Sequence, residues 1–462
     1  MATPATTRSG RPQGRFERRV SILSGAGMFL DGYDVTVIAV ALPGLEQAWN
    51  ITGITAGIVA ASVIIGMFFG MLVGGRLADI FGRRRMYMID LSGFVIFAVA
   101  TALTQQVWQL IILRFLLGLC IGADYPISSS ITAEFTRPQT RGKLIILMSV
   151  FWQSGAFFAY IIGIGLMNVG PSGWRWMLGV GALLAAVVLV MRTRIPESPR
   201  WLRQKGRVEE ALAIEKELST DHATQLGINA TVQGSGHGRW RELFSRRMIR
   251  TTIFCSAFWF AFATAYYGVQ MYTPTILKPF AGGSMTLSYL GSSVVALLGV
   301  AGASLGMYFT ERIGRRKQIL AGFVGMVVTL TLLGLLPSEG LLVITVLLAL
   351  AILMANFGPG VLNNVYPNEM FPTRLRPSGA GFAGAMSRIG AILGVVVFPV
   401  MVDAMGFAKA TFLFAGTALF GLVMSLWLAP ETKGKSLEEL EAAAERGFKP
   451  RPVGSGPSNP AA

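Results

Sequence analysis

Long apolar segments alternate with short polar loops along most of the chain. Each segment holds about 20 predominantly apolar residues, enough to cross roughly 30 Å of hydrocarbon as an α-helix. Six segments precede a long polar interruption and six follow it. They begin near Val20, Ala56, Tyr87, Val107, Leu144, Arg175, Arg250, Met285, Gln318, Leu341, Ala380 and Ala410. The pattern predicts an all-α integral membrane protein with 12 transmembrane helices.

Three short motifs occur twice, at nearly constant separation. The distances are 232, 235 and 234 positions (79 to 311, 134 to 369 and 196 to 430). Such a repeat predicts a parallel duplication of one six-helix unit. The paired residues are Asp79, Gly82, Arg83 and Arg84 with Glu311, Gly314, Arg315 and Arg316; Glu134 and Arg141 with Glu369 and Arg376; and Pro196 and Glu197 with Pro430 and Glu431.

The repeat sets the expected domain boundaries. Residues 20–192 and 250–430 form two pseudo-symmetric six-helix bundles, joined by a central cytoplasmic loop, 193–249. Within that loop, Val208 to Ser219 is predicted to be helical. Residues 1–19 and 431–462 are cytoplasmic tails, the second starting with a polar helix, Ser436 to Arg446. The Pro-, Gly- and Ser-rich end lacks apolar residues and is expected to be disordered.

Composition agrees with a membrane location. Hydrophobic residues make up 53% of the chain and charged residues only 14%, against about 25% charged in soluble domains. The net charge of +16 would suit a nucleic-acid-binding protein, but the basic residues lie in loops between apolar segments. We therefore exclude a soluble enzyme and a nucleic-acid-binding protein, and no catalytic residue, cofactor or metal is expected.

The distribution of basic residues predicts the orientation. Lysine and arginine concentrate in cytoplasmic loops of membrane proteins. Here they lie before the first segment and after the second and fourth: Arg8, Arg11, Arg15, Arg18, Arg19, Arg83, Arg84, Arg85, Arg137, Arg141 and Lys143. We expect a multi-pass protein of the cell membrane, in contact with lipids, acting as a monomer, with both termini in the cytoplasm.

Charged residues inside the apolar segments are candidate functional groups. A charge at a helix centre costs roughly 2.5 to 3.5 kcal/mol on insertion scales. Asp31, Asp34 and Asp124 are therefore predicted to bind the coupling protons, with Arg114 as a possible partner of one of them. Both histidines, His222 and His237, lie in the central loop and are poorly placed for a transmembrane proton relay.

Arg388 lies about nine residues into the eleventh apolar segment, near mid-depth. Its planar guanidinium suits bidentate binding of a carboxylate or phosphate. On the seventh segment, Trp259, Ala263, Tyr266 and Gln270 share one helical face. These residues predict an aromatic wall beside a site for an anion.

The loop from Gly75 to Arg85, Gly-Arg-Leu-Ala-Asp-Ile-Phe-Gly-Arg-Arg-Arg, resembles the signature loop of the major facilitator superfamily. This resemblance implies two six-helix bundles with alternating access and a cytoplasmic charge network that breaks when the inner gate opens. The gating residues that it implies are Gly75, Asp79, Gly82, Arg83, Arg84, Glu134, Arg141, Glu311, Arg315, Glu369 and Arg376.

Three branches of that superfamily have matching motifs. Residues 196–202 (Pro-Glu-Ser-Pro-Arg-Trp-Leu) and 430–434 resemble sugar porters, and Asp31-Gly32-Tyr33-Asp34 resembles aromatic-acid proton symporters. Phosphate proton symporters are similar at residues 122–126 and 356–359. The helix-7 amides of sugar porters are replaced by Ala261, Phe262 and Tyr267, and the helix-7 aspartate of phosphate symporters by Ala263.

These departures favour an organic acid as the substrate. We expect proton-coupled symport of a small organic acid, with an aromatic acid as one option, by alternating access. A sugar, polyol or phosphate symporter is the alternative on the same scaffold, and a non-transporting membrane sensor is the alternative of another class. The predicted substrate-binding residues are Tyr125, Gln153, Trp259, Tyr267, Gln270, Asn356 and Arg388.

Overall fold

The computed structural model describes residues 13–135, 138–170, 172–193, 196–217, 240–336, 340–372, 375–435 and 439–440. Within these ranges the side chains of Gly75, Asp79, Glu134 and Arg141 are not described. The predictions for these four gating residues, for the loop histidines, and for most of both tails therefore lie outside the described residues.

The N-terminal half consists of six long helices. They are α1 (Gln13–Trp49), α2 (Gly53–Phe81), α3 (Arg83–Ala102), α4 (Val107–Phe135), α5 (Pro138–Leu166) and α6 (Gly173–Arg192). Two shorter helices follow, α7 (Pro199–Gln204) and α8 (Val208–Glu217). The stretch predicted to be helical from Val208 is thus helical over its described part.

The C-terminal half repeats this arrangement. A short 3-10 helix, η1 (Trp240–Phe244), precedes α10 (Ile249–Leu277), α11 (Met285–Ile313), α12 (Arg315–Leu335), α13 (Leu341–Phe357), α14 (Pro359–Leu362), α15 (Val365–Met370), α16 (Arg376–Met405) and α17 (Phe407–Leu428). The described residues contain 12 helices long and apolar enough to span a membrane. The predicted number of transmembrane helices and the all-α class are confirmed.

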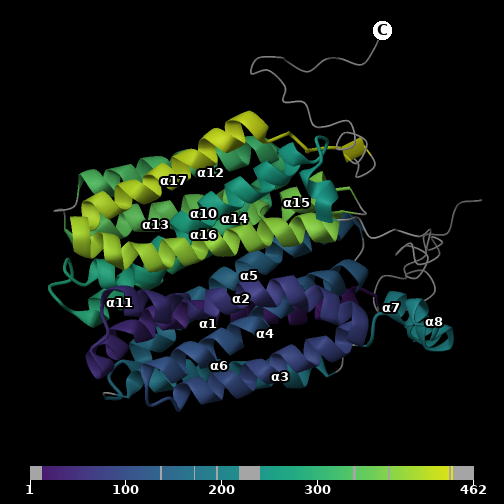
Figure 1. Cartoon of the computed structure of the whole chain (residues 1–462), viewed down its shortest axis with the longest axis horizontal. Helices are drawn as coiled ribbons and strands as arrows, with labels where there is room; N and C mark the ends of the chain where they lie inside the picture. Colours follow the sequence, from purple (N-terminus) through teal and green to yellow (C-terminus); the bar gives the residue numbers. More distant parts are fainter. Residues whose placement is uncertain are drawn as a thin grey trace, which may run out of the picture.

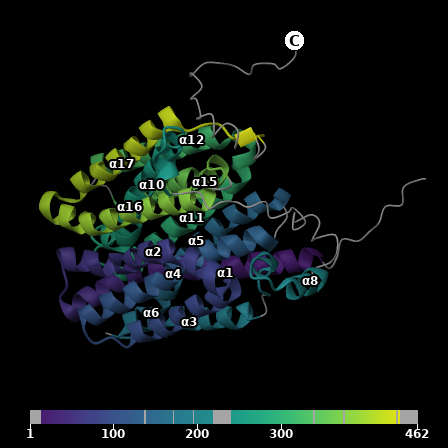
Figure 2. The ribbon, with the colours of Figure 1, turned by 45° about the vertical axis from the view of Figure 1, so that its right-hand side comes forward.

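The two halves form two stacked groups of helices (Figure 1), and the turned view shows the same division (Figure 2). Within the halves α2 packs on α4, α1 on α5, α10 on α16 and α11 on α13. Between the halves α5 packs on α11 and α2 on α16. The interface between the halves is therefore built mainly by two helix pairs, each of which joins the second span of one half to the fifth span of the other.

Glycine permits the closest of these contacts. A Cβ on Gly66 would lie 2.0 Å from the Phe115 carbonyl oxygen, and one on Gly118 would lie 2.1 Å from that of Val63. Small residues let membrane helices approach through dispersion contacts, because lipid supplies no hydrophobic force between them. The α2–α4 pair of the N-terminal half therefore depends on glycine.

The halves also meet at the ends of the helices that flank the α1–α2 loop. The Tyr289 hydroxyl of α11 donates to the Val40 carbonyl of α1 at 2.7 Å. Nearby, a Cβ on Gly57 would lie 3.2 Å from the Cα of Val396. The two halves are thus packed against each other on this side of the molecule.

The tenth span is interrupted after Phe357. Gly358 adopts φ −99° and ψ −99° and separates α13 from α14. An interrupted helix leaves carbonyls without intrahelical partners. The Gln318 amide of α12 donates to the carbonyls of Phe357 (2.7 Å) and Gly306 (3.0 Å). The break is thereby stabilised, and just before it Asn356, the penultimate residue of α13, hydrogen-bonds to Gln153 of the other half.

Candidate transport site

Asp34 of α1 and Arg114 of α4 form a buried ion pair. Arg114 Nη2 lies 3.6 Å from Asp34 Oδ2 and donates to the Asp34 backbone carbonyl at 3.1 Å. Both side chains are buried, and Asp34 Oδ2 accepts no hydrogen bond within the described part of the chain. Arg114 is therefore the partner of Asp34 and of neither other predicted proton-binding aspartate.

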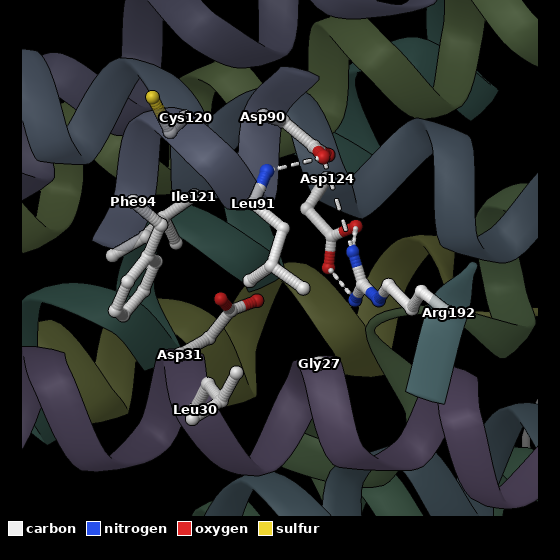
Figure 3. A pocket seen from close by; sticks show the side chains of 10 residues that line it. All are labelled: Gly27, Leu30, Asp31, Asp90, Leu91, Phe94, Cys120, Ile121, Asp124 and Arg192. Atoms are coloured by element: carbon white, nitrogen blue, oxygen red, sulfur yellow. Dashed lines mark hydrogen bonds and ion pairs between the residues drawn. The ribbon is translucent and has the colours of Figure 1, made fainter. Parts of the chain in front are cut away.

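Asp31 lies three residues from Asp34 but faces a different group of residues (Figure 3). It lines a small cavity together with Asp90 of α3, Asp124 of α4 and Arg192 of α6. We call these four residues the acidic centre. All four are buried, with at most 5% of each residue exposed. Two adjacent polar sites are thus enclosed within the N-terminal half.

Arg192 is held at the acidic centre by several contacts. It donates from Nη1 to Asp124 Oδ1 at 3.0 Å and from Nη2 to Oδ2 at 3.1 Å. Its guanidinium carbon lies 3.6 Å from the centroid of the Tyr87 ring. The same Nη1 is 3.9 Å from Asp90 Oδ1. This bidentate pairing and ring stacking fix the guanidinium plane.

The predicted substrate residues meet at the interface between the halves. Gln153 of α5 donates from Nε2 to the Tyr266 hydroxyl at 2.9 Å and also hydrogen-bonds to Asn356 Oδ1. Asn356 in turn donates to the Ile352 carbonyl at 2.9 Å. One amide of the N-terminal half is thereby joined to a tyrosine and an amide of the C-terminal half.

Arg388 of α16 lies in the same region. Its Nη1 donates to the Tyr267 hydroxyl at 3.1 Å, while its Nε has no hydrogen-bond partner among the described residues. No carboxylate in the described part of the chain forms an ion pair with this guanidinium. Tyr125 of α4 also crosses the interface, hydrogen-bonding to Asn364.

Gln270 and Trp259 complete the set predicted from the sequence. Both atoms of the buried Gln270 amide lack a hydrogen-bond partner within the described residues. Trp259 is buried against α16, where a Cβ on Gly384 would lie 3.6 Å from its ring. The Trp152 ring, which we had not predicted, has its centroid 6.1 Å from those of Tyr266 and Tyr267. The region therefore combines aromatic rings with polar atoms available to a ligand.

The predicted gating residues of the C-terminal half form a connected network. Arg315 donates to both oxygens of Glu311 (2.9 and 2.8 Å) and to Glu369 Oε1 at 3.0 Å. Glu369 also accepts from Thr432. Arg376 donates from Nε to the Phe371 carbonyl at 3.4 Å. The Glu311–Arg315–Glu369 network lies within one half of the molecule.

The two repeated turns are built alike. Gly82 (φ 103°) and Gly314 (φ 88°) have positive φ values that favour glycine. Glu197 accepts from the Arg84 backbone nitrogen at 3.0 Å. Glu431 accepts from the backbone nitrogens of Arg315 (3.0 Å) and Arg316 (3.2 Å). Each glutamate thus stabilises a helix N-terminus, α3 or α12, through backbone donors and the helix dipole.

Known proteins resemble this chain over nearly its whole length. Residues 20–444 match the family model described as "Sugar (and other) transporter". The inner membrane metabolite transport protein YgcS of Escherichia coli (strain K12) is 32% identical over 444 residues, covering 95% of this chain and 96% of that protein. The arabinose-proton symporter of Bacillus subtilis (strain 168) is 29% identical, covering 91% and 94%.

Solved structures agree on the fold. The inward-open conformation of the xylose transporter XylE from Escherichia coli superposes with a TM-score of 0.77 at 22% identity, covering 92% of this chain and 99% of that one. The predicted fold and the resemblance to the major facilitator superfamily are therefore confirmed. The prediction that the protein is a transporter and not an enzyme is confirmed as well. The chain belongs to the family of sugar and other transporters, and it is a multi-pass membrane transporter of the metabolite-carrying type.

Proposed function

We propose that this protein carries a small organic anion across the cell membrane together with protons, by alternating access between its two halves. The observation that supports the anion most directly is Arg388. It is buried at the interface between the halves, it hydrogen-bonds to the Tyr267 hydroxyl, and no carboxylate of the described residues forms an ion pair with it. A buried cation without a counter-ion is costly. A bound carboxylate would offset that cost.

The neighbouring groups fit such a ligand. Tyr267 is held at the guanidinium, and the rings of Trp152 and Tyr266 lie beside it. A carboxylate on Arg388 with an apolar or aromatic body against these rings is the corresponding binding mode. The amides of Gln153, Gln270 and Asn356 supply donors and acceptors for further polar groups on the ligand.

Proton coupling is supported by the buried carboxylates of the N-terminal half. Asp34 is paired with Arg114, and a buried pair whose carboxylate takes up a proton loses its attraction. Asp31 is the further proton-binding residue, and Asp124, which is paired with Arg192, belongs to the same coupling site. The related arabinose transporter of Bacillus subtilis is a proton symporter by name.

Orientation follows from the basic loops, which place the Gly82 and Gly314 turns and both termini on the cytoplasmic side in our proposal. We also propose that the protein works as a monomer in contact with lipids.

A neutral sugar or polyol is the second candidate. The hydrogen-bonded group of Gln153, Tyr266 and Asn356 offers the alternating donors and acceptors that hydroxyl groups need. The family model and the named sugar transporters among the relatives favour the same substrate class. In this case Arg388 would serve only as a structural partner of Tyr267.

A thermal-shift screen of the purified protein distinguishes the two candidates. Short organic acids, aromatic acids, sugars, polyols and phosphate are each added in large excess. A ligand at about 100 times its Kd stabilises the folded state by roughly 2.7 kcal/mol, so a substrate raises the melting temperature. We expect an organic anion to do so. Stabilisation by sugars or polyols alone would overturn the anion and favour the second candidate.

Uptake of the ligand identified in this way then tests coupling. Proteoliposomes with an imposed pH gradient and membrane potential should accumulate it, because 100 mV contributes about 2.3 kcal/mol per charge. A protonophore should abolish accumulation without stopping exchange. Concentrative uptake that survives the protonophore would contradict proton coupling.

A further inference from the structure

The acidic centre of Asp31, Asp90, Asp124 and Arg192 carries more negative than positive charge. Three carboxylates face one guanidinium, and the centre is enclosed by α1, α3, α4 and α6 (Figure 3). If all three carboxylates were ionised, two negative charges would be buried without compensation. Burying uncompensated charge costs far more than binding a proton. At least one of these carboxylates is therefore a proton acceptor.

The three carboxylates are compensated to different degrees. Asp124 has the bidentate pair with Arg192 and accepts from the Ser128 hydroxyl at 3.0 Å. Asp90 accepts from the Leu91 backbone nitrogen at 2.6 Å and lies 3.9 Å from Arg192, while its Oδ2 has no partner among the described residues. Asp31 has neither a hydrogen bond nor an ion pair within the described part of the chain. Asp31 is the least stabilised as an anion.

The centre includes space beside Asp31. The cavity that it lines has a volume of ≈ 10 Å³, close to the size needed for one water molecule. Its other lining residues include Gly27 of α1 and Cys120 of α4. A Cβ on Gly27 would lie 2.1 Å from Arg192 Nη2 and 2.7 Å from Asp124 Oδ2. Glycine at this position therefore allows the Arg192–Asp124 pair to lie directly against α1, next to Asp31.

Charged and titratable groups surround Asp31 on several elements. Asp90 comes from α3, Asp124 from α4 and Arg192 from α6. Arg388, on α16 of the other half, also interacts electrostatically with Asp31. This attraction is the weakest of those acting on Asp31, and it is lost when Asp31 is neutral. Asp31 thus links the acidic centre to the interface between the halves.

We infer that the acidic centre is a proton-binding site separate from the Asp34–Arg114 pair, in which Asp124 stays ionised on Arg192 and Asp31 binds the proton. The proton passes from water to a carboxylate oxygen of Asp31, giving a neutral carboxylic acid with no change in oxidation state. The inference rests on the proton-coupled function proposed above and adds two residues to it, Asp90 and Arg192. It predicts that proton binding at Asp31 favours an anion at Arg388.

Infrared spectroscopy of the purified, ligand-free protein tests the proton directly. A water-exposed aspartate ionises near pH 4, so a protonated-carboxyl C=O band that persists at neutral pH reports a buried acid. We expect the parent protein to show this band and Asp31→Asn to lose it. Asp403→Asn, which removes an exposed carboxylate of α16, should leave the band unchanged. A spectrum of Asp31→Asn identical to that of the parent would overturn the inference.

Two further variants keep the test informative if Asp31→Asn does not fold. Asp31→Glu retains the acid and should shift the band without removing it. Asp90→Asn removes a neighbouring negative charge and should weaken proton binding at Asp31 by about tenfold, as expected for one nearby charge in a partly screened interior. Unchanged proton binding in Asp90→Asn would exclude Asp90 from the centre.

The spectroscopic result is independent of transport. A band that depends on Asp31 in a protein whose transport ignores the pH gradient would refute the proposed coupling and leave the proton site standing. Proton-driven transport by a parent protein that lacks the band at neutral pH would refute the proton site at Asp31. Asp34 would then be the residue that couples proton binding to transport.

Discussion

The interiors of the two halves differ in their buried charges. Among the described residues the N-terminal half buries six charged side chains: Asp31, Asp34, Asp90, Asp124, Arg114 and Arg192. The C-terminal half buries Arg388 in its interior and Arg315 at the end of α12. Elsewhere its polar interior consists of neutral groups such as Gln270 and Asn356. The buried carboxylates of the described residues are thus concentrated in one half.

The turns at the helix ends are, in contrast, closely similar. Gly82 and Gly314 have matching positive φ values, and Glu197 and Glu431 bind equivalent backbone donors. The parts that join neighbouring helices are therefore alike in the two halves, whereas the buried charges differ. Under the function proposed above, this difference corresponds to a division of work, with proton binding inside the N-terminal half and ligand recognition at the interface and in the C-terminal half.

The largest expected effect follows removal of the Asp34 carboxylate. Asp34→Asn cannot exchange a proton and leaves Arg114 without its counter-charge. Breaking a buried pair in this way costs roughly 3 to 5 kcal/mol. We expect accumulation to be abolished while exchange continues, measured in proteoliposomes at matched protein content. Asp403→Asn is the control. Accumulation by Asp34→Asn at the parent level would show that proton coupling does not depend on this pair.

Substitution of Arg388 tests the proposed ligand recognition by the C-terminal half. Arg388→Lys keeps the charge but loses the planar fork, and Arg388→Gln loses both. Hydrogen bonds to charged groups contribute about 1.5 to 3 kcal/mol, so we expect uptake of an anionic substrate to fall roughly 10- to 100-fold in Arg388→Gln and less in Arg388→Lys. Uptake at matched surface expression is the measurement. If Arg388→Gln carried an anion at the parent rate, ligand recognition would lie elsewhere.

Gly27→Ala tests how tightly the acidic centre is packed. The added methyl group would lie 2.1 Å from Arg192 Nη2, and overpacking of this kind costs about 1 to 3 kcal/mol. We expect a lower melting temperature of the purified protein. Gly416→Ala in α17 is the matched control, because no atom lies within 4 Å of the added Cβ. Equal melting temperatures for the two variants would mean that the Arg192–Asp124 pair can move away from α1.

The smallest effects are expected at the repeated turns. Glu431 accepts from the backbone nitrogens of Arg315, Arg316 and Lys433, whereas Glu197 accepts from those of Arg84 and Ser198. A charge at a helix N-terminus contributes about 0.3 to 1 kcal/mol. Both Glu→Gln variants should lower the melting temperature, Glu431→Gln more than Glu197→Gln. The reverse order would refute this ranking of the two turns.

Much of the fold was predictable from the sequence because a membrane restricts the length and the hydropathy of each helix that spans it. Twelve apolar segments predicted the 12 spans, and the repeated motifs predicted the two halves. The interruption of the tenth span after Phe357 was not predicted, since the apolar pattern continues past it. Its stabilisation depends on Gln318 of a different helix.

The candidate site was predictable in part. Asp31, Asp34, Asp124 and Arg388 were predicted from the cost of intramembrane charge, and the three aspartates also lie in motifs that resemble known symporters. Asp90 carries the same signal within the third apolar segment and was missed. Arg192 was missed because it ends the sixth segment, where a basic residue is typical of the cytoplasmic membrane boundary.

By itself the sequence determined which residues are buried in the membrane and how many helices hold them. It did not determine which charges meet. Asp31 and Asp34 lie three residues apart on one helix, yet Asp34 pairs with Arg114 while Asp31 faces Asp90, Asp124 and Arg192. Residues at this spacing point in directions about 60° apart on an α-helix. Their partners are decided only by the rotation of α1 and its packing against α3, α4 and α6. Hydropathy determines how deep a helix lies in the membrane, but side-chain packing determines which helices lie next to it.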